Sequence, residues 1–172
     1  MEFLVSTVDD FRLEEIYRSY ANTFPEDERR SQTQFRKLLN HPKAKVISLL
    51  HDATFVGYLI LWELSESVFV EHLEIFPQYR NQNLGSTVFK YLFQEYSKII
   101  LESEPEFWHE EASRRIKFYL RNGFQVIDKD YIQPAYEPEK NAVTLWLLAN
   151  FQPEKKNVMI EEIYDVVYSK IF

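Results

Sequence analysis

The sequence predicts an α/β (α+β) fold, with a mixed, mostly antiparallel sheet of about seven strands flanked by helices. Three strand-like runs follow one another across residues 46–75 with only short polar breaks, which is typical of an antiparallel meander. A helical pattern at residues 84–97 then leads directly into the apolar run at residues 99–101, which indicates a strand, helix, strand crossover. Two further strand-like runs, residues 124–132 and 142–149, are expected to close the sheet.

The N-terminal part is expected to form an edge strand and two helices. Residues 3–8 are apolar and β-branched, which favours a strand. Apolar residues recur at helical spacing over residues 10–22, and Pro25 ends that run. Ser31 is placed to cap a second, shorter helix.

The middle of the chain supplies the remaining elements. Strands are expected at residues 46–50, 55–62 and 68–75, separated by polar breaks. A basic amphipathic helix is expected over residues 112–121, and Gly123 stops it because glycine tolerates the left-handed conformation at a helix end.

The C-terminal residues 158–172 repeat apolar side chains at helical spacing, including Ile163, Val167 and Ile171. This apolar face needs a partner, either the chain's own sheet or a second copy, so both a monomer and a homodimer stay open. A chain of 172 residues fits one domain, which we place at residues 1–150 with a helical extension at 151–172.

Composition excludes several classes of function. The 27 acidic and 20 basic side chains give a net charge of -7, which argues against nonspecific nucleic-acid or anionic-membrane partners. The absence of cysteine excludes disulfides, thiolate metal sites and a catalytic thiol, and the four histidines have no ligand spacing, so no metal is expected. Without a signal-peptide pattern or a long apolar run, the protein is expected to be soluble and cytoplasmic.

The segment at residues 80–86 joins a strand to a helix and has the geometry of a phosphate-binding loop. At a helix N-terminus several backbone N–H groups are unpaired and the macrodipole is positive, so a pyrophosphate can accept those donors. Gly85 keeps the loop slim, and Arg80 supplies a positive charge. An ordinary strand-to-helix turn is the alternative.

This loop resembles the acyl-CoA-binding motif of the GCN5-related N-acetyltransferase (GNAT) family, Arg/Gln-x-x-Gly-x-Gly/Ala. Arg80, Asn83 and Gly85 occupy its three defined positions, and the sequence departs from it at Asn83, a residue type that tolerates a left-handed backbone. Tyr119, followed by Gly123 and Phe124, is similar to the second segment of the family. The order of elements across residues 3–149 also fits.

The resemblance implies a strongly twisted sheet whose fourth and fifth strands, residues 68–75 and 99–104, splay apart to admit the pantetheine arm of CoA. Backbone groups near Leu73, Glu74 and Ile75 would pair with the pantetheine amides. Acetyl-CoA is then the expected co-substrate, and the implied binding residues are Leu73, Ile75, Arg80, Gln82, Asn83, Leu84, Gly85 and Ser86.

Acetyl transfer to an amine needs an acid for the departing thiolate and a base for the amine. Tyr119 matches the family's acid, and its phenol is protonated at neutral pH; a tyrosine that only packs on the core is the alternative. Glu71 is the candidate base, with Glu74 and His72 as rivals. Strand alternation places Glu71 and Leu73 on one face of the sheet, and His72 and Glu74 on the other.

Two sets of residues could hold the acceptor, and they predict opposite acceptor charges. Glu102 and Glu104, at the end of the fifth strand, could bind a cationic acceptor, unless they form a solvated strand end. Arg29 and Arg30, between the first two helices, could instead bind an acceptor carboxylate, unless they form surface ion pairs with Glu26 or Glu28.

The expected function is direct transfer of an acetyl group from acetyl-CoA to the primary amine of a small molecule in a ternary complex. The absence of cysteine agrees with a mechanism that has no covalent enzyme intermediate. Two alternatives stay open: a protein or peptide N-acetyltransferase, and a non-catalytic acyl-CoA-binding module.

Overall fold

The computed structural model describes residues 1–169, so the expected face residue Ile171 lies outside the described residues. The expected helices and strands have counterparts within residues 1–169, and most of their ends differ from expectation by a few residues. The helix expected over residues 158–172 is α-helical only to Ile163 and continues as a π-helical turn to Tyr168. In chain order, the strands are β1 (Glu2–Val5), β2 (Ala44–His51), β3 (Thr54–Glu63), β4 (Val68–Ile75), β5 (Ile99–Ser103), β6 (Gln125–Gln133) and β7 (Val143–Ala149). The helices are α1 (Leu13–Thr23), α2 (Gln32–Leu38), α3 (Leu84–Glu95), α4 (Glu110–Arg121) and α5 (Lys156–Ile163), with short turns η1 (Glu26–Glu28), η2 (Pro77–Tyr79) and the π-helical η3 (Tyr164–Tyr168).

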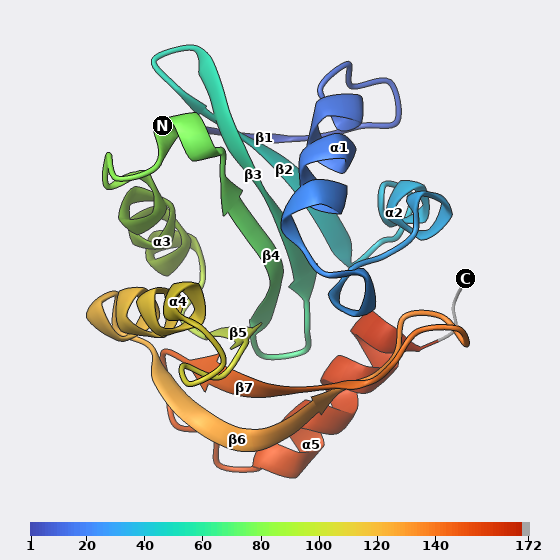
Figure 1. Ribbon diagram of the computed structural model, residues 1–172, viewed down its shortest axis with the longest axis vertical. Helices are drawn as coiled ribbons and strands as arrows, with labels where there is room; N and C mark the ends of the chain where they lie inside the picture. The colour runs from blue at the N-terminus through green and yellow to red at the C-terminus, as the bar shows by residue number, and fades with distance from the viewer. Residues whose placement is uncertain (170–172) are drawn as a thin grey trace.

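The strands of residues 1–169 form a seven-stranded mixed sheet in the order β1-β2-β3-β4-β5-β7-β6. Only the β4–β5 pair in this sheet is parallel, and all other neighbours are antiparallel. In Figure 1, α3 and α4 cover one face, and α1, α2 and α5 lie on the other. This arrangement confirms the predicted fold class.

Local sequence explains where several helices begin and end. The Ser31 hydroxyl accepts a hydrogen bond from the Gln34 N–H at the start of α2, as predicted for an N-cap. The backbone turns at Gly123, with φ of +89°, after α4. The cap of α4 was not predicted: Nδ1 of His109 accepts from the Ala112 N–H at 3.1 Å.

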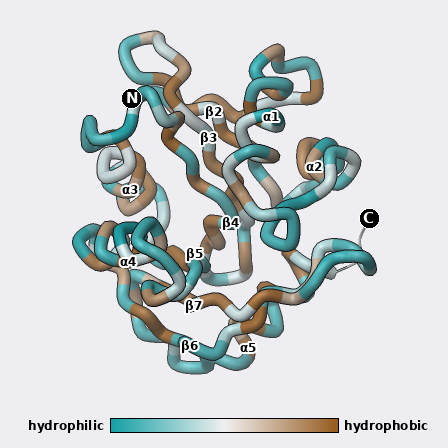
Figure 2. Tube along the Cα trace, in the orientation of Figure 1, coloured by the Kyte–Doolittle hydropathy of each residue, from teal (hydrophilic) through white to brown (hydrophobic). Residues whose placement is uncertain are grey.

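The core lies in two layers, one on each face of the sheet, and Figure 2 shows hydrophobic residues concentrated on the central strands. Ile163 and Val167 are fully buried in the layer that also contains Ile16 and Tyr20 of α1. The C-terminal apolar face is therefore covered by the chain's own core at these two positions. No helix among residues 1–169 combines the length and apolar character needed to cross a membrane.

The strands β4 and β5 stay together for only a short distance. Val68 to Val70 pair with Ile99 to Leu101, and β4 then continues to Ile75 without pairing to β5. The edge of β4 that faces β5 is consequently open over its second half, where the strands separate.

A β-bulge interrupts β4 at the same point. Val70 pairs with Leu61 and His72 pairs with Ile60, so Glu71 is an extra residue without a partner on β3. The extra residue shifts the alternation of side chains, and the expectation that Glu71 and His72 lie on opposite faces is wrong. Both lie on the α1 side, where Glu71 meets Trp62 and His72 meets Tyr20.

Candidate active site

A cavity of about 300 Å³ opens where β4 and β5 separate. Its walls come mainly from β4, β5, α4 and the segment that joins α1 to α2, and one residue each of β6 and β7 completes them, Gln133 and Leu145. The walls bring together His72, Glu102, Tyr119 and Phe24, which are far apart in the sequence.

Acidic side chains outnumber basic ones among the charged residues of this cavity. Five glutamates line it, Glu28, Glu71, Glu102, Glu104 and Glu111, together with a single arginine or lysine among the described residues, Arg115. Arg115 forms an ion pair with Glu104, and Nε2 of His109 lies 3.1 Å from the same carboxylate. Because Nδ1 of His109 accepts from the backbone, its Nε2 carries the proton and donates to Glu104.

Glu102 lines the cavity from β5. Its Oε1 accepts a hydrogen bond from the Tyr168 hydroxyl at 2.5 Å, whereas its Oε2 is buried and has no hydrogen-bond partner among residues 1–169. Burial raises the pKa of Glu102 to about 8, and the charge of Glu71 adds to the shift against the opposing hydrogen bond from Tyr168. A carboxyl of this kind exchanges a proton near neutral pH.

Tyr119 faces the same cavity from α4, about one turn after Arg115. Its side chain is half-buried, and its hydroxyl makes no hydrogen bond to the described residues. Burial raises the pKa of Tyr119, although nearby Arg115 acts in the opposite direction. The phenol is therefore protonated at neutral pH and free to donate.

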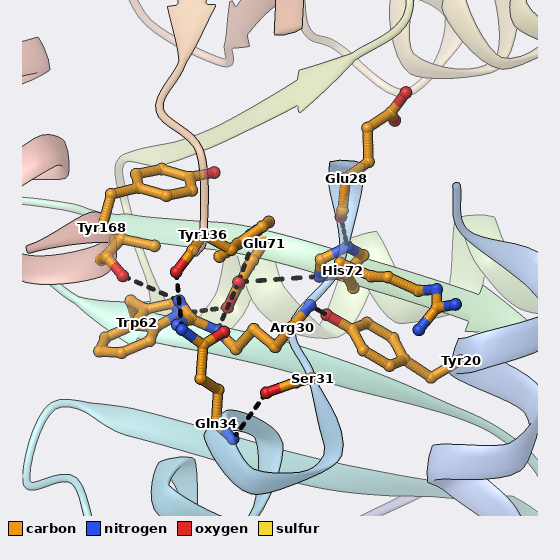
Figure 3. Close-up of polar contacts among 12 residues, drawn as sticks. Tyr20, Glu28, Arg30, Ser31, Gln34, Trp62, Glu71, His72, Tyr136 and Tyr168 are labelled. Carbon is orange, nitrogen blue, oxygen red and sulfur yellow. Dashed lines mark hydrogen bonds and ion pairs between the residues drawn. The ribbon is translucent and has the colours of Figure 1, made fainter. Parts of the chain in front are cut away.

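Glu71 reaches the cavity wall, but its carboxylate is fully engaged (Figure 3). Oε1 accepts from Nε of Arg30 at 2.9 Å and from the Tyr136 hydroxyl at 2.7 Å, and Oε2 accepts from Nε1 of Trp62 at 2.6 Å. Burial alone would raise the pKa of Glu71, but Arg30, His72 and the donors outweigh it and lower the pKa. This carboxylate stays ionised and has little capacity to take a proton.

Arg30 lies inside the protein and is 1% exposed. Its second guanidinium nitrogen donates to the carbonyl of Val167 at 2.8 Å, and the guanidinium sits over the rings of Trp62 and Tyr136. The expectation of a surface ion pair with Glu26 or Glu28 is wrong, because the partner is the buried Glu71. Because its guanidinium is buried, Arg30 is not placed to bind an acceptor carboxylate.

Arg29 does not line the cavity either. Its Nε donates to the Phe24 carbonyl at 3.1 Å, and Nζ of Lys140 donates to the carbonyl of Arg29 itself. These contacts fasten the loop between α1 and α2, whose Phe24 forms part of the cavity wall.

Glu74 and His72, the alternative candidates for the base, have different hydrogen-bond partners. Glu74 accepts hydrogen bonds from Ser19 at 3.0 Å and Thr23 at 2.7 Å, so it fastens β4 to α1. Nε2 of His72 lies 2.9 Å from the carbonyl of Glu28 and must donate to it, which leaves Nδ1, 4.0 Å from Oε1 of Glu71, as an acceptor. This Nδ1 is buried without a hydrogen-bond partner among the described residues, and burial lowers the pKa of His72 to about 4.

The loop before α3 has the backbone that the sequence indicated. Asn81 and Asn83 have φ of 63° and 61°, in the left-handed region. Asn83 stands where the family motif has glycine, and it adopts the left-handed backbone that a glycine would allow at that position. The exposed Gln82 lies between the two asparagines, and the N–H groups of Leu84, Gly85 and Ser86 open the helix without partners inside it.

Arg80 is anchored beside this loop. Its Nε donates to the Ile75 carbonyl at 3.0 Å, and its guanidinium lies 3.6 Å from Glu74. Its side chain is 51% exposed, so the charge is presented at the surface where the open edge of β4 ends. Leu73 and Ile75, on the α3 side of that edge, are half-buried.

Gly85 serves a packing role in addition to the one expected. A Cβ atom at this position would lie 2.9 Å from Cζ of Phe118, so the missing side chain lets α3 approach α4.

The sequence did not identify Glu28, His109 or Tyr168 as parts of the site. Glu28 lies in an acidic loop that looked like surface, and Tyr168 belongs to a helical pattern that indicated only an apolar face. No local signal connects Tyr168 to Glu102, because their contact joins residues 66 positions apart.

Comparison with known proteins agrees with this architecture. The model of the Acetyltransferase (GNAT) family matches residues 12–124. A Bacillus subtilis protein provisionally named a ribosomal protein bS18-alanine N-acetyltransferase is 26% identical over 119 residues, which cover 67% of this chain and 70% of that protein.

Solved structures share the fold over nearly the whole chain. A structure from Bacteroides thetaiotaomicron, provisionally described as a GNAT-family acetyltransferase, has a TM-score of 0.89 at 25% identity and covers 98% of each chain. The PaiA N-acetyltransferase of Thermoplasma acidophilum, solved in complex with coenzyme A, has a TM-score of 0.59 at 17% identity, covering 86% of this chain and 96% of that one.

Proposed function

Because the chain belongs to the Acetyltransferase (GNAT) family, we propose that it transfers an acetyl group from acetyl-CoA to the primary amine of a small molecule, directly and in a ternary complex. One observation carries the proposal. The open edge of β4 runs from the loop before α3 to a cavity in which a free tyrosine hydroxyl and a carboxyl of raised pKa are both present.

The residues along this path fit CoA. The unpaired N–H groups of Gly85 and Ser86 at the start of α3 would bind the pyrophosphate, together with those of Gln82, Asn83 and Leu84. Arg80 supplies a partly exposed positive charge beside them. On the side of β4 that faces β5, the backbone near Leu73 and Ile75 has no strand partner. Its groups that are not already hydrogen-bonded, as the Ile75 carbonyl is to Arg80, would pair with the pantetheine amides.

Acetyl-CoA supplies an activated acetyl thioester. Two side chains of this protein would transfer protons, one to the departing sulfur and one from the amine nitrogen. The amine nitrogen forms a bond to the acetyl carbon as the bond from that carbon to sulfur breaks. We assign Tyr119 as the acid that gives its proton to the departing sulfur, since its hydroxyl is protonated and unpaired.

We assign the base to Glu102 in preference to Glu71. Glu71 already accepts three hydrogen bonds and its pKa is lowered, whereas Oε2 of Glu102 is free to receive the amine proton. A pKa of about 8 also suits a base that works near neutral pH. Glu71 is then not a proton acceptor. Its charge raises the pKa of Glu102, and its ion pair holds Arg30 in place.

A second candidate is acetylation of a peptide or protein N-terminus. The name of the Bacillus subtilis relative favours it, since that protein is named for an alanine of a ribosomal protein. The chemistry at Tyr119 and Glu102 would be the same. A cytoplasmic location stays a prediction.

The test begins with calorimetric titration of the protein with acetyl-CoA and CoA, followed by a thiol-release screen of amines and short peptides. We expect Tyr119→Phe to lower kcat by about 100-fold while acetyl-CoA affinity changes little, because the ring and its packing remain. Tyr91→Phe, a tyrosine outside the cavity, is the matched control. An unchanged kcat in Tyr119→Phe would remove this residue from the mechanism, and absence of CoA binding would refute the proposed function.

A further inference from the structure

We infer that the acceptor carries a second cationic group besides the amine that is acetylated, and that the Glu28 carboxylate binds it. This inference rests on the proposed acetyl transfer and names the class of acceptor. The shared chemistry is a cation at a short distance from a primary amine, as in a diamine or in a peptide whose second residue is basic.

The first observation concerns Glu28 itself. It stands on the cavity wall, half-buried, and its carboxylate forms no ion pair or hydrogen bond with residues 1–169. Figure 3 shows the carboxylate extending away from the Arg30–Glu71 pair, while the backbone carbonyl of the same residue meets His72. Burial raises its pKa, against the pull of Arg115 and His109.

A partly desolvated carboxylate without a partner is costly to maintain. A cation that enters the cavity would remove this cost. The residue next to Glu28 in the turn shows the contrast, because Asp27 is fully paired with the backbone and side chain of Asn141.

The second observation is independent and concerns His72 of β4 and Glu102 of β5. Nδ1 of His72, on a side chain that is 5% exposed overall, and Oε2 of Glu102 are both buried and unpartnered among the described residues. Nδ1 accepts hydrogen bonds in the neutral imidazole, Oε2 accepts them when Glu102 is ionised, and an ammonium group offers only donors. The cavity thus has acceptors without a hydrogen-bond donor on β4 and β5, and an unpaired carboxylate in the turn between α1 and α2.

The third observation excludes an anionic acceptor group. Arg115 is the only arginine or lysine that lines the cavity in the described part of the chain, and Glu104 already pairs with it. Arg29 and Arg30 face elsewhere, and burial leaves His72 neutral. An acceptor carboxylate would therefore meet Glu28 and Glu111 without a compensating cation.

The experiment compares three acceptors of equal length that differ only at the far end: 1,4-diaminobutane, 4-aminobutan-1-ol and 4-aminobutanoate. We expect kcat/KM to be highest for the diamine and lowest for the amino acid. Glu28→Gln should lower kcat/KM for the diamine about tenfold, the effect of about 1.4 kcal/mol, and change that for the amino alcohol less than twofold. Glu26→Gln, an exposed glutamate of the same turn outside the cavity, is the matched control.

A second arm uses two short peptides, Ala-Arg-Ala and Ala-Gln-Ala amides, with the same variants. Preference for the arginine peptide that Glu28→Gln removes would assign the cation to a peptide, and the same result with the diamine alone would assign it to a small molecule. Equal rates with cationic and neutral acceptors, or an equal response of both to Glu28→Gln, would overturn the inference while leaving acetyl transfer intact. If no amine in either arm releases thiol, the proposed function fails and this inference fails with it.

Discussion

Removal of the Tyr168 hydroxyl should shift the pH dependence of acetyl transfer toward higher pH. In the structure this hydroxyl donates to Oε1 of Glu102 at 2.5 Å and stabilises the ionised carboxylate. Tyr168→Phe removes the donor and keeps the ring against Tyr136. The groups that face Glu102 from the other elements are Tyr131, Glu71 and Glu28, and all of them remain.

The magnitude follows from the hydrogen bond that is lost. A hydrogen bond to a charged group contributes about 1.5 kcal/mol at the lower end of its range, and one pKa unit corresponds to about 1.4 kcal/mol. The pKa of Glu102, about 8 in the wild type, should therefore rise by about one unit. Because the base works in its ionised form, kcat/KM at pH 7 should fall about tenfold, and the loss should shrink above pH 9.

The assay is thiol release from acetyl-CoA between pH 6 and pH 10 at constant ionic strength, with one acceptor for all variants. The acceptor amine also titrates, but its contribution is the same in each variant, so the difference between the profiles isolates Glu102. Tyr164→Phe is the control, because it removes a hydroxyl of the same helical turn that donates to the carbonyl of Ile132. A Tyr168→Phe profile that coincides with the wild type would refute Glu102 as the base.

Two further predictions concern stability. Arg30→Met should lower the free energy of unfolding in urea by about 3–5 kcal/mol, because it leaves the buried Glu71 charge unpaired. Adding Glu71→Gln should recover part of this loss. A loss below about 1 kcal/mol in Arg30→Met would contradict a stabilising buried ion pair. Gly85→Val should cost about 1–3 kcal/mol through pressure on Phe118, and Phe118→Leu in the same chain should relieve it. Unchanged stability with lost CoA affinity in Gly85→Val would show that the glycine serves only the phosphate loop.

Much of the fold could be predicted from the sequence, because local patterns determine it. The meander, the crossover through α3 and the Ser31 cap each follow from residues that are neighbours in the chain. The left-handed backbone at Asn83 was also foreseeable, since the loop needs it and asparagine tolerates it.

The candidate site was less predictable because its contacts are long-range. Period-two reasoning failed at Glu71, where one extra residue changes the face on which the next side chains lie. Composition could not show that Arg30 is buried, since arginine is usually exposed and its partner stands 41 positions away. Nor could it reveal that Glu28 lacks a partner, because that depends on where its neighbours point.

The contact between Arg30 and the carbonyl of Val167 joins residues 137 positions apart. During synthesis, the loop that carries Glu28 and Phe24 emerges early, but this tie cannot form until Val167 has left the ribosome. This part of the cavity wall is therefore fastened only after all seven strands of the sheet have emerged. Loss of the segment around η3 would remove this tie together with the Tyr168 hydroxyl that donates to Glu102.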